Sequence, residues 1–149
     1  MKIEGRFIFP ASSQEVWDLL TDPQSLQHCT PGCKQLTEIA TDEFEATMEV
    51  GIGPIKGTFN MSVEFIDLRA PEHAEVLARG QAPGSAVEMR NTMDLVAAGE
   101  RTTLRWASDV TVNGMIAQVG ARLMQGAADK ITQQVFSCIK AKLEAPVTA

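Results

Sequence analysis

Apolar and polar residues alternate with a period of two along most of the chain between Lys34 and Val112. The clearest run is Glu43 to Val50, in which every second residue is apolar and the residues between them are Glu or Thr. Such alternation is typical of an antiparallel strand with one buried and one solvated face. The pattern predicts strands at residues 3–9, 34–40, 43–50, 58–65, 74–81, 86–96 and 102–112.

Helical patterns flank this strand-rich region. Ser12 to Glu15 has the S-x-x-E form of a capping box and precedes apolar residues at helical spacing, which predicts a short helix. Asp22-Pro23 predicts the start of a second short helix, which ends at Pro31-Gly32. From Asn113-Gly114, a predicted cap, the apolar period is near 3.6 as far as about Leu143. This last segment predicts one helix about 45 Å long, enough to cross the face of a curved sheet.

These elements predict an α+β fold. A curved antiparallel sheet of about seven strands wraps around a long C-terminal helix, and two short helices follow the first strand. A chain of 149 residues suits one domain, which we place at residues 1–144, with a disordered tail at 145–149.

The methionines suggest that the interior receives a ligand. Six of the seven fall on the apolar side of a predicted strand or helix, namely Met48, Met61, Met89, Met93, Met115 and Met124. Methionine is unbranched and polarizable, so it adapts to ligands of variable shape. A single buried methionine is more often ordinary core, so the prediction depends on the six together.

Small residues in the long predicted helix allow two explanations. Gly120, Gly126, Ala127 and Ala128 lie near its middle, although each Gly costs about 1 kcal/mol relative to Ala in a helix interior. They either permit close helix–sheet packing or leave room for a ligand. The second explanation predicts a mainly apolar cavity of about 300 to 1,000 Å³ between helix and sheet. Its expected lining is Phe44, Met48, Phe59, Met61, Val63, Met89, Asn91, Met93, Leu104, Trp106, Ser108, Ile116, Val119, Gly120, Leu123, Met124 and Ala127.

The composition disfavours several classes of partner. The net charge is -6 and Lys and Arg form no cluster, so nucleic acid is not an expected partner. The first residues alternate in polarity, unlike a signal peptide, and no apolar run reaches about 18 residues. Cys29, Cys33 and Cys138 are an odd number, which predicts reduced thiols. We therefore expect a cytoplasmic protein, with peripheral contact to the inner face of the cytoplasmic membrane as an option.

The expected inner face lacks groups for acid–base catalysis, because Asn91 and Ser108 are its only polar members. His28 and His73 fall in predicted loops or element ends, where solvated side chains are expected. Alternation places Arg90, Asp94 and Arg105 on the outer face, unless a one-residue bulge turns one of them inward. His28, Cys29 and Cys33 beside a Pro-Gly turn are more typical of a loop than of a metal site. No catalytic or metal-binding residue is predicted.

Four stretches carry a family resemblance. They are Pro-Ala-Ser-Ser-Gln-Glu-Val-Trp-Asp-Leu-Leu-Thr-Asp-Pro (10–23), Pro31-Gly32-Cys33, Val-Gly-Ile-Gly-Pro-Ile-Lys-Gly-Thr-Phe (50–59), and Val119-Gly120-Ala121-Arg122-Leu123 leading into Gly126-Ala127-Ala128. In this order they resemble the CoxG family, the G subunit of carbon monoxide dehydrogenase. The predicted element order is similar to the helix-grip fold of the START-like (SRPBCC) superfamily, which sets architecture only.

The resemblance implies a non-catalytic accessory protein of a molybdenum- and flavin-containing, carbon monoxide dehydrogenase-type oxidoreductase. Members of the family are described as helping to attach that enzyme to the cytoplasmic membrane. The expected ligand is an isoprenoid quinone, with a lipid as the second candidate. No tightly bound cofactor is expected. Asn91 or Ser108 could then orient a quinone carbonyl. Many relatives end in an apolar anchor, whereas this sequence ends in Ala-Pro-Val-Thr-Ala, so we expect only transient membrane contact by the domain itself.

Two other functions stay open. The first is a module that docks the dehydrogenase through exposed loops, with an incidental cavity. The loop residues expected to contact the enzyme or the membrane are Pro31, Gly32, Cys33, Gly53, Pro54 and Ile55, the last three within a hairpin turn at residues 51–57. The second is a polyketide cyclase-like enzyme, which would need a polar cavity.

Overall fold

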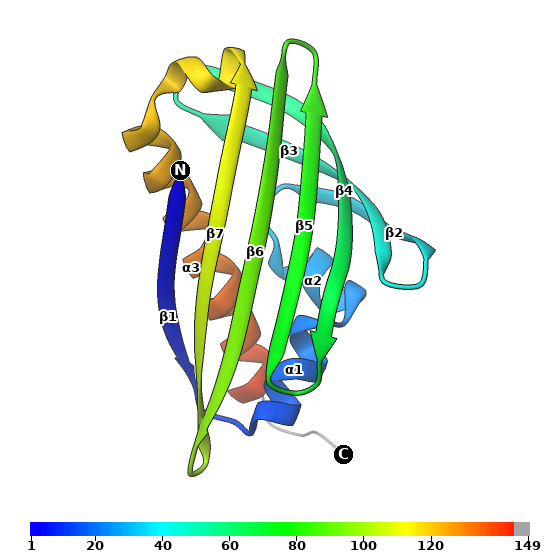
Figure 1. Ribbon diagram of the computed structural model, residues 1–149, viewed down its shortest axis with the longest axis vertical. Helices are drawn as coiled ribbons and strands as arrows, with labels where there is room; N and C mark the ends of the chain where they lie inside the picture. Colours follow the sequence, from blue (N-terminus) through cyan, green and yellow to red (C-terminus); the bar gives the residue numbers. More distant parts are fainter. Residues whose placement is uncertain (145–149) are drawn as a thin grey trace.

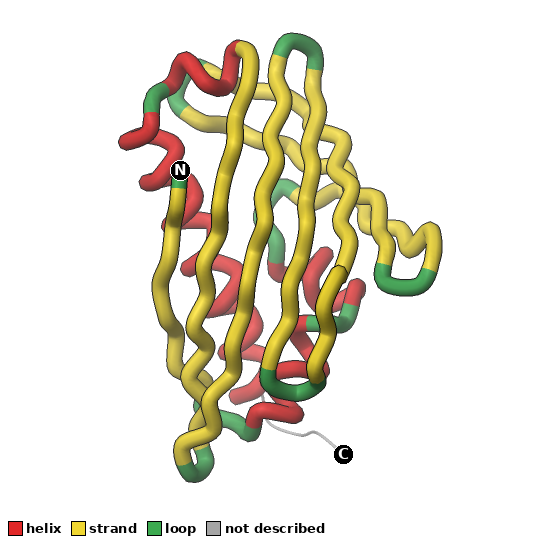
Figure 2. Tube along the Cα trace, in the orientation of Figure 1, coloured by secondary structure: helices red, strands yellow, loops and turns green. Residues whose placement is uncertain are grey.

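The computed structural model describes residues 1–144, so the tail predicted at 145–149 lies outside the described residues. Seven strands form one antiparallel sheet in the order β1-β7-β6-β5-β4-β3-β2 (Figures 1 and 2). Strands β2 to β7 each pair with their neighbours along the chain, and β1 completes the sheet beside β7. The strands are β1 (Lys2–Phe9), β2 (Cys33–Ala40), β3 (Glu43–Ile52), β4 (Ile55–Arg69), β5 (His73–Ala82), β6 (Ser85–Ala98) and β7 (Arg101–Gly114).

The helices gather on one side of the sheet, behind it in the view of Figure 1. They are α1 (Ser13–Leu20), α2 (Pro23–Cys29), the 3-10 helix η1 (Met115–Val119) and α3 (Ala121–Glu144). The predicted α+β helix-grip architecture is confirmed, with two short helices after the first strand and a long C-terminal helix. Within residues 1–144, no helix has both the length and the hydropathy needed to cross a bilayer.

Both short helices begin where the sequence predicts. The Ser12 hydroxyl accepts a hydrogen bond from the Glu15 backbone N–H at 3.2 Å, which is the N-cap half of a capping box, and it donates to the Glu15 carboxylate at 3.0 Å. The Asp22 carboxylate accepts bonds from the backbone N–H of Ser25 at 3.3 Å and from its hydroxyl at 2.7 Å. These side chains satisfy donors at the first turns that have no partner within the helices.

The prediction of one continuous helix from Asn113 was wrong. Strand β7 stays paired with β6 as far as Gly114, and η1 and Gly120 then separate it from α3. Gly114 and Gly120 have φ angles of 81° and 88°, a region that favours glycine, so the chain turns sharply at both positions. Helix α3 has 24 residues and is therefore about 36 Å long.

The hairpin between β3 and β4 is also tighter than predicted. Pairing continues as far as Ile52 opposite Ile55, which leaves Gly53 and Pro54 as the turn. Gly53 has a φ of 57°, as expected for a glycine in a short hairpin. The seven-residue reversal predicted at 51–57 is therefore mostly strand.

Two of the three cysteines form a disulfide, contrary to the prediction of reduced thiols. Cys29 at the end of α2 bonds to Cys138 in α3, with their Cα atoms 5.4 Å apart, and Cys33 is free. The bridge joins the two helices across 109 positions of sequence. It removes Cys29 from any metal set with His28 and Cys33. The cysteine count therefore no longer supports the expected cytoplasmic location.

Buried side chains form two clusters between the helices and the sheet. The first joins β1, α1, the end of α2 and the second half of α3 to strands β5, β6 and β7. Its buried members are Phe9, Ala11, Val16, Trp17, Leu20, Cys29, Ala74, Leu95, Leu104, Phe136 and Ile139. The second lies near η1 and the β3–β4 hairpin, and its buried members are Ile52, Phe59, Ile116 and Met124. We call the first the packed cluster and the second the hairpin cluster.

Candidate ligand cavity

A cavity of about 470 Å³ lies between α3 and the concave face of the sheet. Its walls come from strands β1 to β7, from η1 and from both α2 and α3. The volume falls within the range of about 300–1,000 Å³ that is usual for sites that enclose a small molecule.

Most of the side chains expected at the cavity are found there. The predicted residues that line it are Phe44, Met48, Phe59, Met61, Val63, Met89, Asn91, Met93, Trp106, Ser108, Ile116, Met124 and Ala127. Those on a strand are separated by an even number of positions, so the period of two predicts that they share the inner face of the sheet. Five of the six selected methionines take part, namely Met48, Met61, Met89, Met93 and Met124.

The remaining predicted lining residues lie elsewhere. Leu104 is fully buried in the packed cluster instead of lining the cavity. Val119 packs against the hairpin cluster from η1, and Gly120 forms the break before α3. Leu123 is 50% exposed, and Met115, the sixth methionine expected on an apolar side, is 53% exposed. Because the helix begins at Ala121 and not near Asn113, the helical phase assumed from the sequence is wrong in this segment.

Other lining residues were missed. Helix α3 also contributes Ala128, Ile131, Thr132 and Phe136, α2 and its C-cap contribute Pro23, Leu26 and Thr30, and β2 contributes Cys33. Ile131 belongs to the apolar stripe of the C-terminal segment, which is a usable signal for it. No sequence pattern predicts the α2 residues at the cavity, because the pattern of a short helix does not indicate which part of the sheet it covers.

The cavity wall has almost no charge. Its lining within residues 1–144 includes no Asp, Glu, Lys, Arg or His side chain. The α-amino group of Met1 is the one charged group on a lining residue of this described chain, and it donates to the Val110 carbonyl at 2.8 Å. The described wall thus contains neither a carboxylate nor an imidazole, which are among the most frequent general acids and bases.

Two polar side chains lie next to each other within this apolar wall. Asn91 on β6 pairs directly with Ser108 on β7 in the sheet register. The Asn91 side-chain amide donates to the Val76 carbonyl at 3.4 Å, a long hydrogen bond. The Ser108 hydroxyl is buried and has no hydrogen-bond partner among residues 1–144. A polar group in that condition is uncommon in folded proteins and needs an explanation.

The free Cys33 thiol also belongs to the cavity wall. Partial burial raises its pKa above the ordinary value, because an apolar setting disfavours the thiolate. The thiol lies 3.7 Å from the Gln35 carbonyl, to which it donates. Cys33 is therefore protonated at neutral pH and is a poor nucleophile there.

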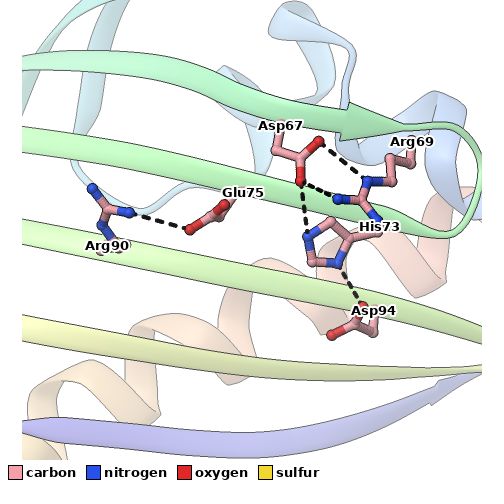
Figure 3. A network of polar contacts seen from close by, with 6 residues as sticks. All are labelled: Asp67, Arg69, His73, Glu75, Arg90 and Asp94. Atoms are coloured by element: carbon pink, nitrogen blue, oxygen red, sulfur yellow. Dashed lines mark hydrogen bonds and ion pairs between the residues drawn. The ribbon is translucent and has the colours of Figure 1, made fainter.

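The outer face of the sheet has the opposite character (Figure 3). His73 Nδ1 lies 2.6 Å from the Asp94 carboxylate, and its Nε2 lies 3.7 Å from that of Asp67. Arg69 binds Asp67 through two nitrogens at 3.3 and 3.1 Å. The outward placement predicted for Asp94 is confirmed, whereas His73, predicted to be solvated, is held at the start of β5.

Three groups in this outer network could act as metal ligands. Atoms of Asp67, His73 and Glu75 lie within 4.8 Å of one another. Arginines already neutralise both carboxylates, since Arg69 binds Asp67 and Arg90 lies 3.4 Å from Glu75. The arrangement is that of a cross-strand charge network on a solvated face. The outward placement predicted for Arg90 and Arg105 also holds, because Arg90 faces this network and Arg105 is exposed.

The predicted contact loops differ in how they are held. Pro31, Gly32 and Cys33 join α2 to β2, and the Gly32 carbonyl accepts a hydrogen bond from the Glu49 N–H at 2.8 Å. Gly53 and Pro54 are exposed at the β3–β4 turn, whereas Ile55 already belongs to β4. The turn is therefore the more accessible of the two regions.

The sequence comparison agrees with this architecture. The family model for CoxG, the G subunit of carbon monoxide dehydrogenase, matches residues 5–144. The chain belongs to the CoxG family. No curated protein sequence matches it significantly.

Several solved structures share the fold of this CoxG-family chain. A conserved protein from Geobacillus kaustophilus is 28% identical, with a TM-score of 0.91 over 96% of this chain and 95% of its own. The Zhui aromatase/cyclase from Streptomyces sp. R1128 is 13% identical, with a TM-score of 0.75 over 100% and 96%. A START superfamily protein from Mycobacterium smegmatis is 14% identical, with a TM-score of 0.71 over 96% and 97%. The last two similarities establish the START-like fold and not a shared activity.

Proposed function

We propose that this CoxG-family protein is a non-catalytic accessory protein of a molybdenum- and flavin-containing, carbon monoxide dehydrogenase-type oxidoreductase. It takes up a hydrophobic molecule in its cavity, an isoprenoid quinone first and a lipid second. By carrying that molecule it couples the enzyme to the cytoplasmic membrane and the respiratory chain.

The observation that carries the proposal is the cavity of about 470 Å³ with a lining free of ionisable carboxylates and imidazoles. Removing a CH₂ group from water contributes about 0.8 kcal/mol, so an isoprenoid or acyl chain gains affinity without a charged contact. The methionines of the wall can adjust to such a flexible chain. The family supports the link to a dehydrogenase, because its members are named as a subunit of carbon monoxide dehydrogenase.

A transfer experiment tests this proposal. The protein is incubated with phospholipid vesicles that contain an isoprenoid quinone, separated from them and extracted for mass spectrometry. We expect quinone to copurify with the chain in roughly equal molar amount. If the protein separated from quinone-containing vesicles has neither quinone nor lipid bound to it, the carrier function is contradicted.

A matched pair of variants shows whether the cavity is the binding site. Ala127→Phe places a large ring in the cavity wall, whereas Ala141→Phe adds the same ring at an exposed position of the same helix. We expect the first variant to lose at least tenfold in quinone uptake and the second to keep it. Equal uptake by both would place the ligand outside the cavity.

The exposed β3–β4 turn favours a second candidate, a docking module for the dehydrogenase. Replacing Pro54 and Ile55 with polar residues should then abolish copurification with the enzyme and leave ligand uptake unchanged. Pro83→Ala in the exposed turn before β6 is the control. An enzymatic function of the cyclase type has weaker support, because the described cavity wall has no carboxylate or imidazole and burial raises the pKa of its Cys33 thiol.

A further inference from the structure

We propose that the cavity selects a neutral ligand with a carbonyl group, which accepts hydrogen bonds from Ser108 and Asn91, and that it rejects carboxylates and phosphates. This inference rests on the carrier function proposed above and narrows the class of cargo. It separates an uncharged quinone or ester from a free fatty acid or an intact phospholipid headgroup.

The first argument is the condition of Ser108. The residue is 7% exposed, lines the cavity, and has a hydroxyl without a partner in the described chain. A buried hydroxyl loses its hydrogen bonds to water on folding and normally regains them within the protein. The oxygen itself is buried in the ligand-free chain, so the side chain has to rotate about its Cα–Cβ bond to present the O–H to an acceptor on a ligand.

The second argument is the position of Asn91. It faces Ser108 across the β6–β7 pair, so the two side chains lie on the same face of adjacent strands. One amide hydrogen of Asn91 is directed to the Val76 carbonyl, and the second is available. A carbonyl oxygen has two lone pairs, so it can accept from the hydroxyl and the amide together.

The third argument is the charge of the wall. A carboxylate or phosphate in an apolar setting needs a cation or several strong donors to offset the loss of hydration. The described lining has no Lys, Arg or His side chain, and the α-amino group of Met1 is committed to the Val110 carbonyl. A neutral carbonyl does not need such compensation.

A set of ligands with one chain length and different head groups provides the test. Methyl oleate, sodium oleate and 8-heptadecene are compared below their aggregation limits, at pH 8, by displacement of the neutral fluorescent probe N-phenyl-1-naphthylamine. We expect methyl oleate to bind about tenfold more tightly than the hydrocarbon and at least tenfold more tightly than oleate. Equal affinity for oleate and its ester would overturn the proposal, because the cavity would then not discriminate against a carboxylate.

Ser108→Ala isolates the polar group, with Ser62→Ala on the exposed face of β4 as the matched control. We expect Ser108→Ala to weaken methyl oleate three- to tenfold, to leave 8-heptadecene unchanged, and to raise the melting temperature of the ligand-free protein. That combination is not expected from a purely structural residue. An unchanged ester affinity in this variant overturns the proposal.

Asn91→Leu is the second variant and should weaken the ester by a similar factor while keeping hydrocarbon binding. The hydrocarbon separates the two levels of inference. If 8-heptadecene does not displace the probe and no ligand binds, the carrier function itself fails. If the hydrocarbon binds but the ester has no advantage over it, only the selection of a carbonyl fails.

Discussion

The packed cluster and the ligand cavity lie between the same helices and sheet but differ in how their side chains pack. The packed cluster is filled by aromatic and branched side chains, and Phe7, Phe9 and Phe136 form contacts with ring centroids 4.8 to 6.0 Å apart. Around the cavity, methionines and alanines stand among the aromatic side chains, and about 470 Å³ remains open. The first arrangement gives the close packing that stabilises a fold. The second arrangement packs less closely and leaves space for a ligand.

Helix α3 joins the two regions. Ile139 lies within the packed cluster, Ala127 faces the cavity, and Phe136 belongs to both because it packs on the aromatic rings and lines the cavity. Packing of one end of α3 in the packed cluster can therefore fix the position of its other end, which forms a wall of the cavity. The comparison predicts that stability and ligand binding respond to substitutions in different parts of the molecule.

The largest expected effect is a loss of stability in the packed cluster. Leu104 is fully buried, so Leu104→Ala should lower the free energy of unfolding by about 3–5 kcal/mol. Met89→Ala should cost only about 1 kcal/mol or less, because this side chain already borders open space. Urea denaturation of ligand-free protein measures both values. Similar losses would mean that the two regions are equally packed.

The disulfide provides the next largest test. It links α2 to α3 beside the packed cluster, and Cys29 is itself a buried member of that cluster. A cross-link across 109 positions should stabilise the fold by about 2–4 kcal/mol, so a Cys29→Ala, Cys138→Ala double variant should lose about that amount.

As the control, the free energy of unfolding of the wild-type protein is measured with and without a reductant. Reduction should lower wild-type stability toward that of the double variant and leave the variant unchanged. A wild-type protein insensitive to reductant would argue that the two thiols are not bonded.

The strands and the concave face could be predicted from the sequence because strand periodicity is local. In a strand, the side of the sheet that a residue faces follows from whether its position is odd or even. This rule placed Met48, Met61 and Met89 at the cavity, although no single one of them identifies a ligand site. The capping residues Ser12 and Asp22 are equally local and marked the short helices correctly.

The errors concern features that depend on distant parts of the chain. Gly114 could have been a helix cap, but its pairing with Ser85 on β6 extends the strand instead. The resulting shift in helical phase misplaced Leu123, which is exposed. The bond between Cys29 and Cys138 follows from the docking of α2 on α3, which no sequence pattern indicates.

The smallest expected effect concerns the chemical reactivity of Cys33, the free cysteine of the cavity wall, compared with the bonded cysteines Cys29 and Cys138. Cys29 and Cys138 are bonded to each other, so iodoacetamide should modify one thiol in the folded chain and none in Cys33→Ser. Because burial raises the pKa of Cys33, modification at pH 7.5 should be about three- to tenfold slower than in urea-unfolded, non-reduced protein.

The pH dependence of this reaction has a definite sign. A raised pKa in the folded state favours the protonated thiol, so its small contribution to stability is present at neutral pH and is lost as the pH rises through the folded-state pKa. The modification rate should increase over the same range. Since Cys33 lines the cavity, a bound ligand should slow the reaction further. A rate that matches the unfolded chain at every pH, with or without ligand, would mean that Cys33 is exposed to solvent and that this side of the cavity is open.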